Sequence, residues 1–149
     1  SSDLSRFLVQ FDFTKYSTKE AIVDAVQNIP YYGGYTYTGI ALYRVRTRLF
    51  PLARAGVPHI LIVLTDGRAN DDVDDHAEAL RDTGVHIISV GVGNADHREL
   101  EEIASKPADE NVFMASFDSV VSLASSILED VCKGERKQKQ FFSFCEHFC

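Results

Sequence analysis

The sequence lacks any long hydrophobic run. Its longest uninterrupted stretch of apolar residues covers only 60–64, whereas a membrane-spanning helix needs roughly 18. Basic residues are also few: the sequence has 15 Lys and Arg and 22 Asp and Glu, which gives a formal charge of −7. A uniformly acidic surface is a poor match for a phosphate backbone. The sequence therefore predicts no membrane span and no nucleic-acid partner.

Methionine and cysteine are scarce as well. The single methionine, Met114, is internal, so we expect a processed product or a fragment. The three cysteines lie near the end of the chain, at Cys132, Cys145 and Cys149. Their odd number favours disulfides in an oxidising compartment, with one cysteine left for another chain. Zinc held by the same residues is the alternative, although their spacing is not typical of zinc modules.

The composition changes at Cys132, and this change divides the chain. Its 149 residues are enough for one ordinary domain. The body up to this point is acidic, whereas the segment after it holds four basic and two acidic residues. We expect a single domain over 1–132, followed by a basic, aromatic and cysteine-containing tail over 133–149.

Hydrophobic periodicity predicts alternating strands and helices. The run at 60–64 has no polar alternation, which indicates a strand covered on both faces, as in a parallel sheet with helices on each side. This order predicts an α/β fold: an open, doubly wound, mostly parallel sheet flanked by helices. The expected strands cover 7–13, 60–64, 85–92 and 111–115, and the expected helices run from a capping box at 17–20 to Pro30, along 41–49, and over 73–81, 96–105 and 117–132.

The candidate site lies in loops at the carboxyl ends of the strands, where ligands of such sheets bind. Thr36 lies in a glycine-rich segment before a helix, and Asp66 follows the strand at 60–64. Their hydroxyl and carboxylate oxygens suit Mg²⁺, Mn²⁺ or Ca²⁺. Gly67 suits a left-handed conformation after the strand. The alternative is that Thr36 caps a helix and Asp66 caps a turn.

A second group of acids follows closely. It would make either a further cation site or a rim that steers basic ligands. Its ordinary role is a solvated loop and helix N-terminus, where acids interact favourably with the helix dipole, and we favour that interpretation. The group consists of Asp71, Asp72, Asp74 and Asp75, followed by His76.

Three segments, in this order, closely resemble the von Willebrand factor type A domain. They read Gly-Gly-Tyr-Thr-Tyr-Thr-Gly-Ile-Ala-Leu at 33–42, Ile-Leu-Ile-Val-Leu-Thr-Asp-Gly at 60–67, and Val-His-Ile-Ile-Ser-Val-Gly-Val-Gly at 85–93. The resemblance covers about 7–132. Within the family, the sequence looks most like the collagen-, matrilin- and cochlin-type extracellular members.

That resemblance implies a metal-ion-dependent adhesion site on the sheet. Thr36 would be its loop Thr and Asp66 its loop Asp, with Gly34, Thr38 and Gly67 on the ligand-binding rim. The family's Asp-x-Ser-x-Ser motif is not found at the start of this sequence. The resemblance therefore implies a domain without its first strand, first helix and second strand. Its ion site would be incomplete unless another chain supplies the rest.

These observations predict a secreted, extracellular adhesion module. We expect it to bind collagen or another matrix protein through the ion site, with a disulfide-linked or complementing chain as a further partner. A purely structural matrix component that has lost its ion site is the alternative. A metal-dependent phosphoryl-transfer enzyme subunit is a remote one, because doubly wound sheets also serve that chemistry. No cluster of nucleophile, base and orienting residue is evident in the sequence, so we expect no enzyme.

Overall fold

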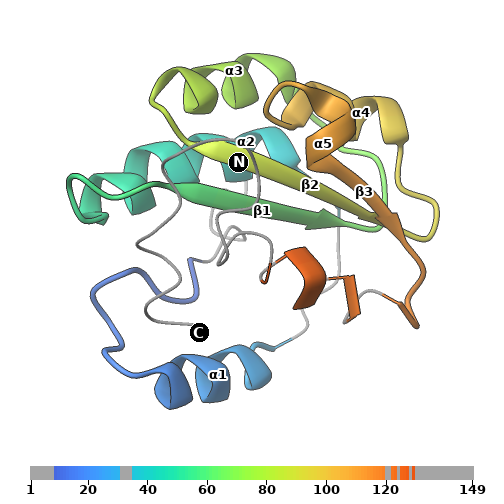
Figure 1. Cartoon of the computed structure of the whole chain (residues 1–149). Helices are drawn as coiled ribbons and strands as arrows, with labels where there is room; N and C mark the ends of the chain where they lie inside the picture. Colours follow the sequence, from blue (N-terminus) through green and yellow to red (C-terminus); the bar gives the residue numbers. More distant parts are fainter. Residues whose placement is uncertain (1–8, 31–34, 120–121, 124, 128, 130–149) are drawn as a thin grey trace.

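A three-stranded parallel sheet forms the centre of the part of the chain that the structure describes. The computed structural model describes residues 9–30, 35–119, 122–123, 125–127 and 129. The strands are β1 (Ile60–Thr65), β2 (His86–Val92) and β3 (Val112–Ala115), in the order β1-β2-β3 (Figure 1). Both neighbouring pairs are parallel. The predicted α/β class, with a parallel sheet flanked by helices, is confirmed.

Helices α2 (Thr38–Arg44), α3 (Asp74–Asp82) and α4 (His97–Ile103) cover one face of this sheet. Helix α2 continues through a π-helical turn, η2 (Val45–Leu49), and a 3₁₀ turn, η3 (Phe50–Leu52). A four-residue helix, α5 (Ala108–Asn111), leads into β3. The shared core joins side chains from all three covering helices to the sheet; it consists of Leu42, Val73, Ala77, Leu80, Val85, Ile87 and Ile103.

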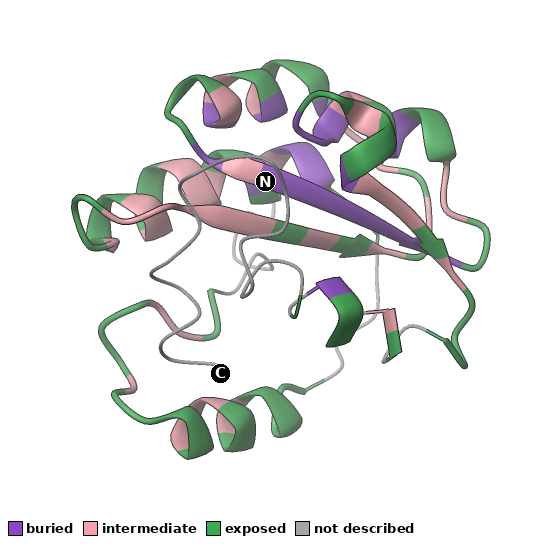
Figure 2. Cartoon of the chain, in the orientation of Figure 1, coloured by how far each residue is buried: buried purple, intermediate pink, exposed green. Residues whose placement is uncertain are grey.

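The opposite face is covered over β2. Ile88 and Val90 point to that side and pack with Ile127, which is 1% exposed. The described residues between 122 and 129 are helical, as predicted, whereas 117–119, where the predicted helix begins, form a turn. Every residue of β2 after His86 is buried, because helices lie on both of its sides (Figure 2).

Strand β1 differs from the prediction that both of its faces are covered. Leu61 and Val63 pack on the core beneath α2 and α3. On the other face Ile62 is 43% exposed and Leu64 is 61% exposed. Within the described residues β1 pairs with β2 alone, so it is an edge strand. The cluster behind β2 includes Ile60 at the start of β1, but Ile62 and Leu64 stay exposed. The unbroken apolar run therefore has one partly buried face on the core and one face that is open at Ile62 and Leu64.

The predicted strand at 7–13 is wrong over its described part. Residues 9–12 have no regular structure, and a turn begins at Phe13. The Asp12 carboxylate accepts the Thr14 backbone N–H at 2.8 Å and the Thr14 hydroxyl at 2.6 Å. These local hydrogen bonds favour a turn over an extended strand. Within the described residues no strand lies beside 9–13 whose backbone hydrogen bonds would stabilise the extended form.

Helix α1 (Lys19–Gln27) forms as predicted and buries none of its residues. The cap is Thr18, whose Oγ1 accepts the Ala21 N–H at 3.3 Å. This is one residue later than in the predicted capping box at 17–20, in which Glu20 lies three residues after Ser17. The helix ends before Pro30, as expected. Its apolar side chains stay open, with Val23 at 41% and Val26 at 51% exposure, and Figure 1 shows α1 apart from the sheet.

Candidate functional site

The two loops predicted to form the site lie against each other. Asn70 donates its backbone N–H to the Thr36 carbonyl oxygen at 2.7 Å, and its side-chain amide donates to the same oxygen at 3.0 Å. Asn70 belongs to the loop that begins with Asp66 at the end of β1. The connections that carry Thr36 and Asp66 therefore meet at the carboxyl edge of the sheet, as the strand order requires.

Asp71 caps helix α2 from this second loop. Its Oδ1 accepts the Gly39 N–H at 3.1 Å and its Oδ2 accepts the Ile40 N–H at 2.7 Å. The residue at the N-cap position, Tyr37, makes no side-chain cap. The expected alternative role of Thr36, capping this helix, is thus filled by Asp71.

Gly39 is required by how closely the second loop approaches. A β-carbon added at Gly39 would overlap the carbonyl oxygen of Asp72 and come within 2.9 Å of Asp71 Oδ2. The backbone of the loop therefore rests directly on the first turn of α2. Thr38 begins that turn and is buried, at 8% exposure.

The turn after β1 is made by Thr65. Its hydroxyl donates to the Gly67 carbonyl oxygen at 3.1 Å and accepts the Gly67 N–H at 3.4 Å. Gly67 does not have the positive φ expected of it, because the hydroxyl closes the turn without a left-handed residue. The capping role considered for Asp66 is filled by its neighbour, and Asp66 itself is exposed.

Sequence reasoning missed Glu99, a buried carboxylate on α4. It is 8% exposed, and the Ala69 backbone N–H lies 3.0 Å from each of its two oxygens. Burial raises the pKa of the Glu99 carboxyl, the bond from Ala69 lowers it, and the nearby charge of Asp96 raises it further. The available sequence signal was the capping-box pattern from Asp96 to Glu99. Asp96 does cap α4, but Glu99 turns to the neighbouring loop instead of back to the cap.

The acidic group at 71–75 forms a loop and a helix N-terminus, as we favoured from the sequence, apart from Asp71, which caps α2. Asp74 and Asp75 form the first turn of α3. Asp72 accepts the Asp74 N–H at 3.1 Å. On the outer side of the loop, Arg68 and Asp96 approach to 3.8 Å in a largely solvated ion pair.

The oxygens present fit a hard divalent ion in type but fall short in number. A hydroxyl from Thr36 and a carboxylate from Asp66 are the oxygens the sequence assigned to such an ion. Among the residues that the structure describes, no group of three or more His, Cys, Asp or Glu is arranged to hold a metal. Gly34 and the cysteines Cys132, Cys145 and Cys149 lie outside the described residues. The ligand roles of Thr36 and Asp66 stay predictions.

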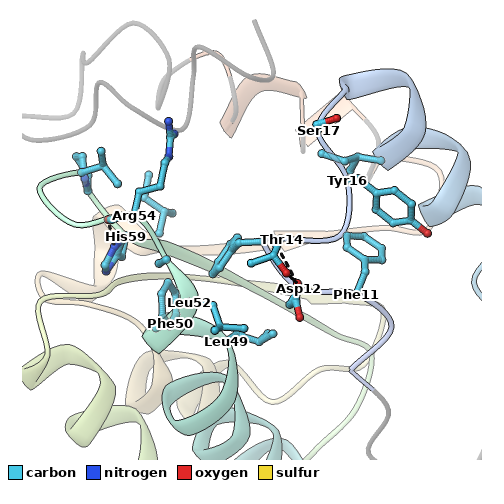
Figure 3. A pocket seen from close by; sticks show the side chains of 16 residues that line it. Phe11, Asp12, Thr14, Tyr16, Ser17, Leu49, Phe50, Leu52, Arg54 and His59 are labelled. Atoms are coloured by element: carbon cyan, nitrogen blue, oxygen red, sulfur yellow. Dashed lines mark hydrogen bonds between the residues drawn. The ribbon is translucent and has the colours of Figure 1, made fainter.

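A second feature is an apolar cavity beside the start of β1. It has a volume of about 550 Å³ and lies between the segment around Phe11 and Phe13 and the chain that runs from Leu49 to Ile60 (Figure 3). Aromatic and aliphatic side chains line most of it, with Asp12 and Arg54 also present.

In the described part of the chain no helix is long and apolar enough to cross a membrane.

The fold and the two meeting loops define a class of protein: an α/β domain that presents binding groups at the carboxyl edge of a parallel sheet. The chain belongs to the von Willebrand factor type A domain family, whose model matches residues 4–126. The family inferred from the three sequence segments is thereby confirmed.

Relatives of known identity are matrix proteins. The chain is 38% identical to the collagen alpha-4(VI) chain of Mus musculus over 91% of its own length and 6% of the relative. It is 35% identical to cochlin of Homo sapiens, covering 88% of the chain and 24% of cochlin. It is 34% identical to vitrin of Mus musculus, covering 83% and 19%. The chain thus spans less than a quarter of the length of these relatives.

A solved structure supports the same assignment. Proximal thread matrix protein 1 from the mussel byssus, with a zinc-occupied metal-ion-dependent adhesion site, matches with a TM-score of 0.73 and 34% identity. The match covers 83% of this chain and 31% of the mussel protein. The relatives are secreted proteins of the extracellular matrix, so the chain is an extracellular, matrix-type domain. Type A domains of such proteins are generally non-enzymatic.

Proposed function

We propose that this chain is an adhesive module that binds a collagen-like or other matrix protein at the carboxyl edge of its sheet. The observation that carries the proposal is that other residues of the two loops make the structural hydrogen bonds. Asp71 caps α2 and Thr65 closes the turn after β1, so the structural roles considered for Thr36 and Asp66 are taken by other residues. Asp66 is left exposed at an edge where the two loops meet.

In this proposal Thr36 and Asp66 supply two oxygens to Mg²⁺, Mn²⁺ or Ca²⁺. Water or oxygens of another polypeptide fill the other positions of the ion. An acidic side chain of the matrix ligand completes the coordination, and Gly34, Thr38 and Gly67 belong to the rim around it. The zinc-occupied site of the mussel protein supports this assignment.

A complementing polypeptide is the second part of the proposal. The His59 carbonyl oxygen accepts the His86 N–H at 2.8 Å, so residue 59 directs its backbone groups toward β2. Backbone groups alternate along a strand, which turns those of Ile60, Ile62 and Leu64 to the open edge. An extended segment that pairs there would add a strand beside β1 and reach the cavity beside Ile60.

Two other functions predict different results. A structural component without an ion site predicts binding or crosslinking that divalent ions do not affect. A phosphoryl-transfer enzyme predicts Mg²⁺-dependent turnover of a phosphate ester; it would need further carboxylates beside Asp66. The acidic group that begins at Asp71 caps α2 and opens α3, and this use disfavours an enzyme.

The test is binding of the chain to immobilised collagen in Mg²⁺ and in EDTA. We expect Asp66→Ala to weaken Mg²⁺-dependent binding about tenfold or more, as for loss of one charged contact. Asp109→Ala is the matched control, because Asp109 is exposed in α5, at the opposite edge of the sheet. Equal binding in EDTA would remove the metal mechanism, and absence of any matrix binding would contradict the proposal.

A further inference from the structure

A buried carboxylate ties the loop that carries Asp66 to helix α4. Both oxygens of Glu99 face the Ala69 N–H, at 3.0 Å each. The charged groups around this carboxylate are Asp96 and Glu102 on α4 itself and Arg68 on the loop. Two of the three are acidic, so the local field does not favour an ionised Glu99. An apolar side chain would fill such a site at lower electrostatic cost, which indicates that Glu99 is used for its bond to the loop.

The loop has fixed points on both sides of Asp66. Upstream, Thr65 is the last residue of β1 and is in register with Gly91 of β2. Downstream, Ala69 is held by Glu99, and Asn70 and Asp71 are bonded to the segment from Thr36 to Ile40. Residues 66–68 therefore form a three-residue arc between the end of β1 and the Ala69 anchor.

The hydrogen bond from Ala69 joins the loop to a different element than the other downstream contacts do. Asn70 and Asp71 tie the loop to the chain that begins α2, on the Thr36 side. Glu99 ties it to a different element, α4, where the N-cap residue Asp96 also lies near Arg68. Removing Glu99 would leave the Thr36 side attached and free the arc to move away from α4.

We propose that Glu99 is the positioning residue of this edge: by accepting the Ala69 N–H, it fixes where Asp66 stands relative to Thr36. It acts through the loop backbone and touches neither the ion nor the matrix ligand. The first consequence, an anchored loop, is independent of function. The second, a preset ion site, rests on the proposed function.

The test compares Glu99→Ala with Glu99→Gln, which keeps a carbonyl acceptor of the same length. Glu101→Ala is the control, because Glu101 is an exposed acid on the same helix. We expect amide hydrogen exchange at Ala69 to be about tenfold faster in Glu99→Ala, since the hydrogen bond to the Glu99 carboxyl is lost. Glu99→Gln should restore most of the protection, and Glu101→Ala should leave it unchanged. Unchanged exchange at Ala69 in folded Glu99→Ala would overturn the proposal.

If Glu99→Ala fails to fold, Glu99→Leu takes its place, because it fills the space and lacks an acceptor. The second readout is Mn²⁺ affinity by titration calorimetry on folded variants. We expect it to fall about tenfold without the acceptor and to recover in Glu99→Gln. A wild-type chain that binds no Mn²⁺ would count against the proposed ion site, while the exchange result would still decide the anchoring role. Equal Mn²⁺ affinity in all variants would overturn the preset site alone.

Discussion

Asp71 and Ile40 lie far apart in the sequence, and the Asp71 carboxylate accepts the Ile40 backbone N–H at 2.7 Å. The other oxygen of the same carboxylate accepts the N–H of Gly39. A residue of the loop after β1 therefore supplies the N-terminal cap of α2. The two loops of the candidate site are held together by a charged hydrogen bond as well as by backbone contacts.

The first prediction concerns this cap. Asp71→Ala should lower the free energy of unfolding by about 1–2 kcal/mol, because two N–H groups in the first turn of α2 lose their acceptor. Asp71→Asn should cost less, since its carbonyl oxygen can still accept one bond. Urea denaturation measures both. Asp75→Asn serves as the control, because Asp75 is exposed in the first turn of α3. Equal stability of Asp71→Ala and Asp75→Asn would contradict the capping role.

The second prediction compares two glycines of the candidate site. Gly39→Ala should destabilise the fold by about 2 kcal/mol or more, since its methyl group would push the loop off α2. Gly67→Ala should change stability by less than about 0.5 kcal/mol, because a β-carbon there meets nothing within 4 Å and φ is not positive. Thermal unfolding of the two variants distinguishes them. A larger loss in Gly67→Ala would show that the loop packs differently.

The third prediction follows from the raised pKa of Glu99. A carboxyl with a higher pKa in the folded state binds its proton more tightly there, so its contribution favours folding below the ordinary pKa of 4.5. That contribution is lost as the pH rises through the raised folded pKa. Relative to Glu99→Gln, the wild type should therefore lose stability as the pH rises through this window. Urea denaturation of both proteins from pH 4 to 7 measures how this stability difference changes with pH. A difference that grows in favour of the wild type as the pH rises would mean that the hydrogen bond from Ala69 affects the pKa of Glu99 more than burial does.

The fourth prediction concerns the open edge of β1. Leu64→Lys should change the stability of the isolated chain by less than about 0.5 kcal/mol, because Leu64 is 61% exposed. It should also reduce any association between copies of the chain through this edge, since a charge on an exposed strand opposes edge pairing. Sedimentation velocity measures the association. Val63→Lys is the contrasting variant and should destabilise the fold, because Val63 packs against the core under α2 and α3. Association that Leu64→Lys leaves unchanged would place the contact elsewhere.

Local sequence signals gave the elements and their order. The apolar run at 60–64 and the hydroxyls before α1 each act within a few residues, and the structure has a strand and the start of a helix there. The prediction failed at residues 9–13 because an extended strand needs a neighbour, whereas the Asp12 turn needs only the next three residues.

The sequence by itself determined the α/β class, the parallel strands and the meeting of two polar loops at one edge, because hydrophobic period and strand direction are encoded locally. Only the tertiary structure decided what each polar residue in that edge does. Asp71, Glu99 and Asn70 bond to backbone groups 30 or more residues away, and no local pattern reports such distant partners. The open face of β1 was decided in the same way, since burial depends on what packs against a strand and an apolar side chain does not reveal whether a neighbour covers it.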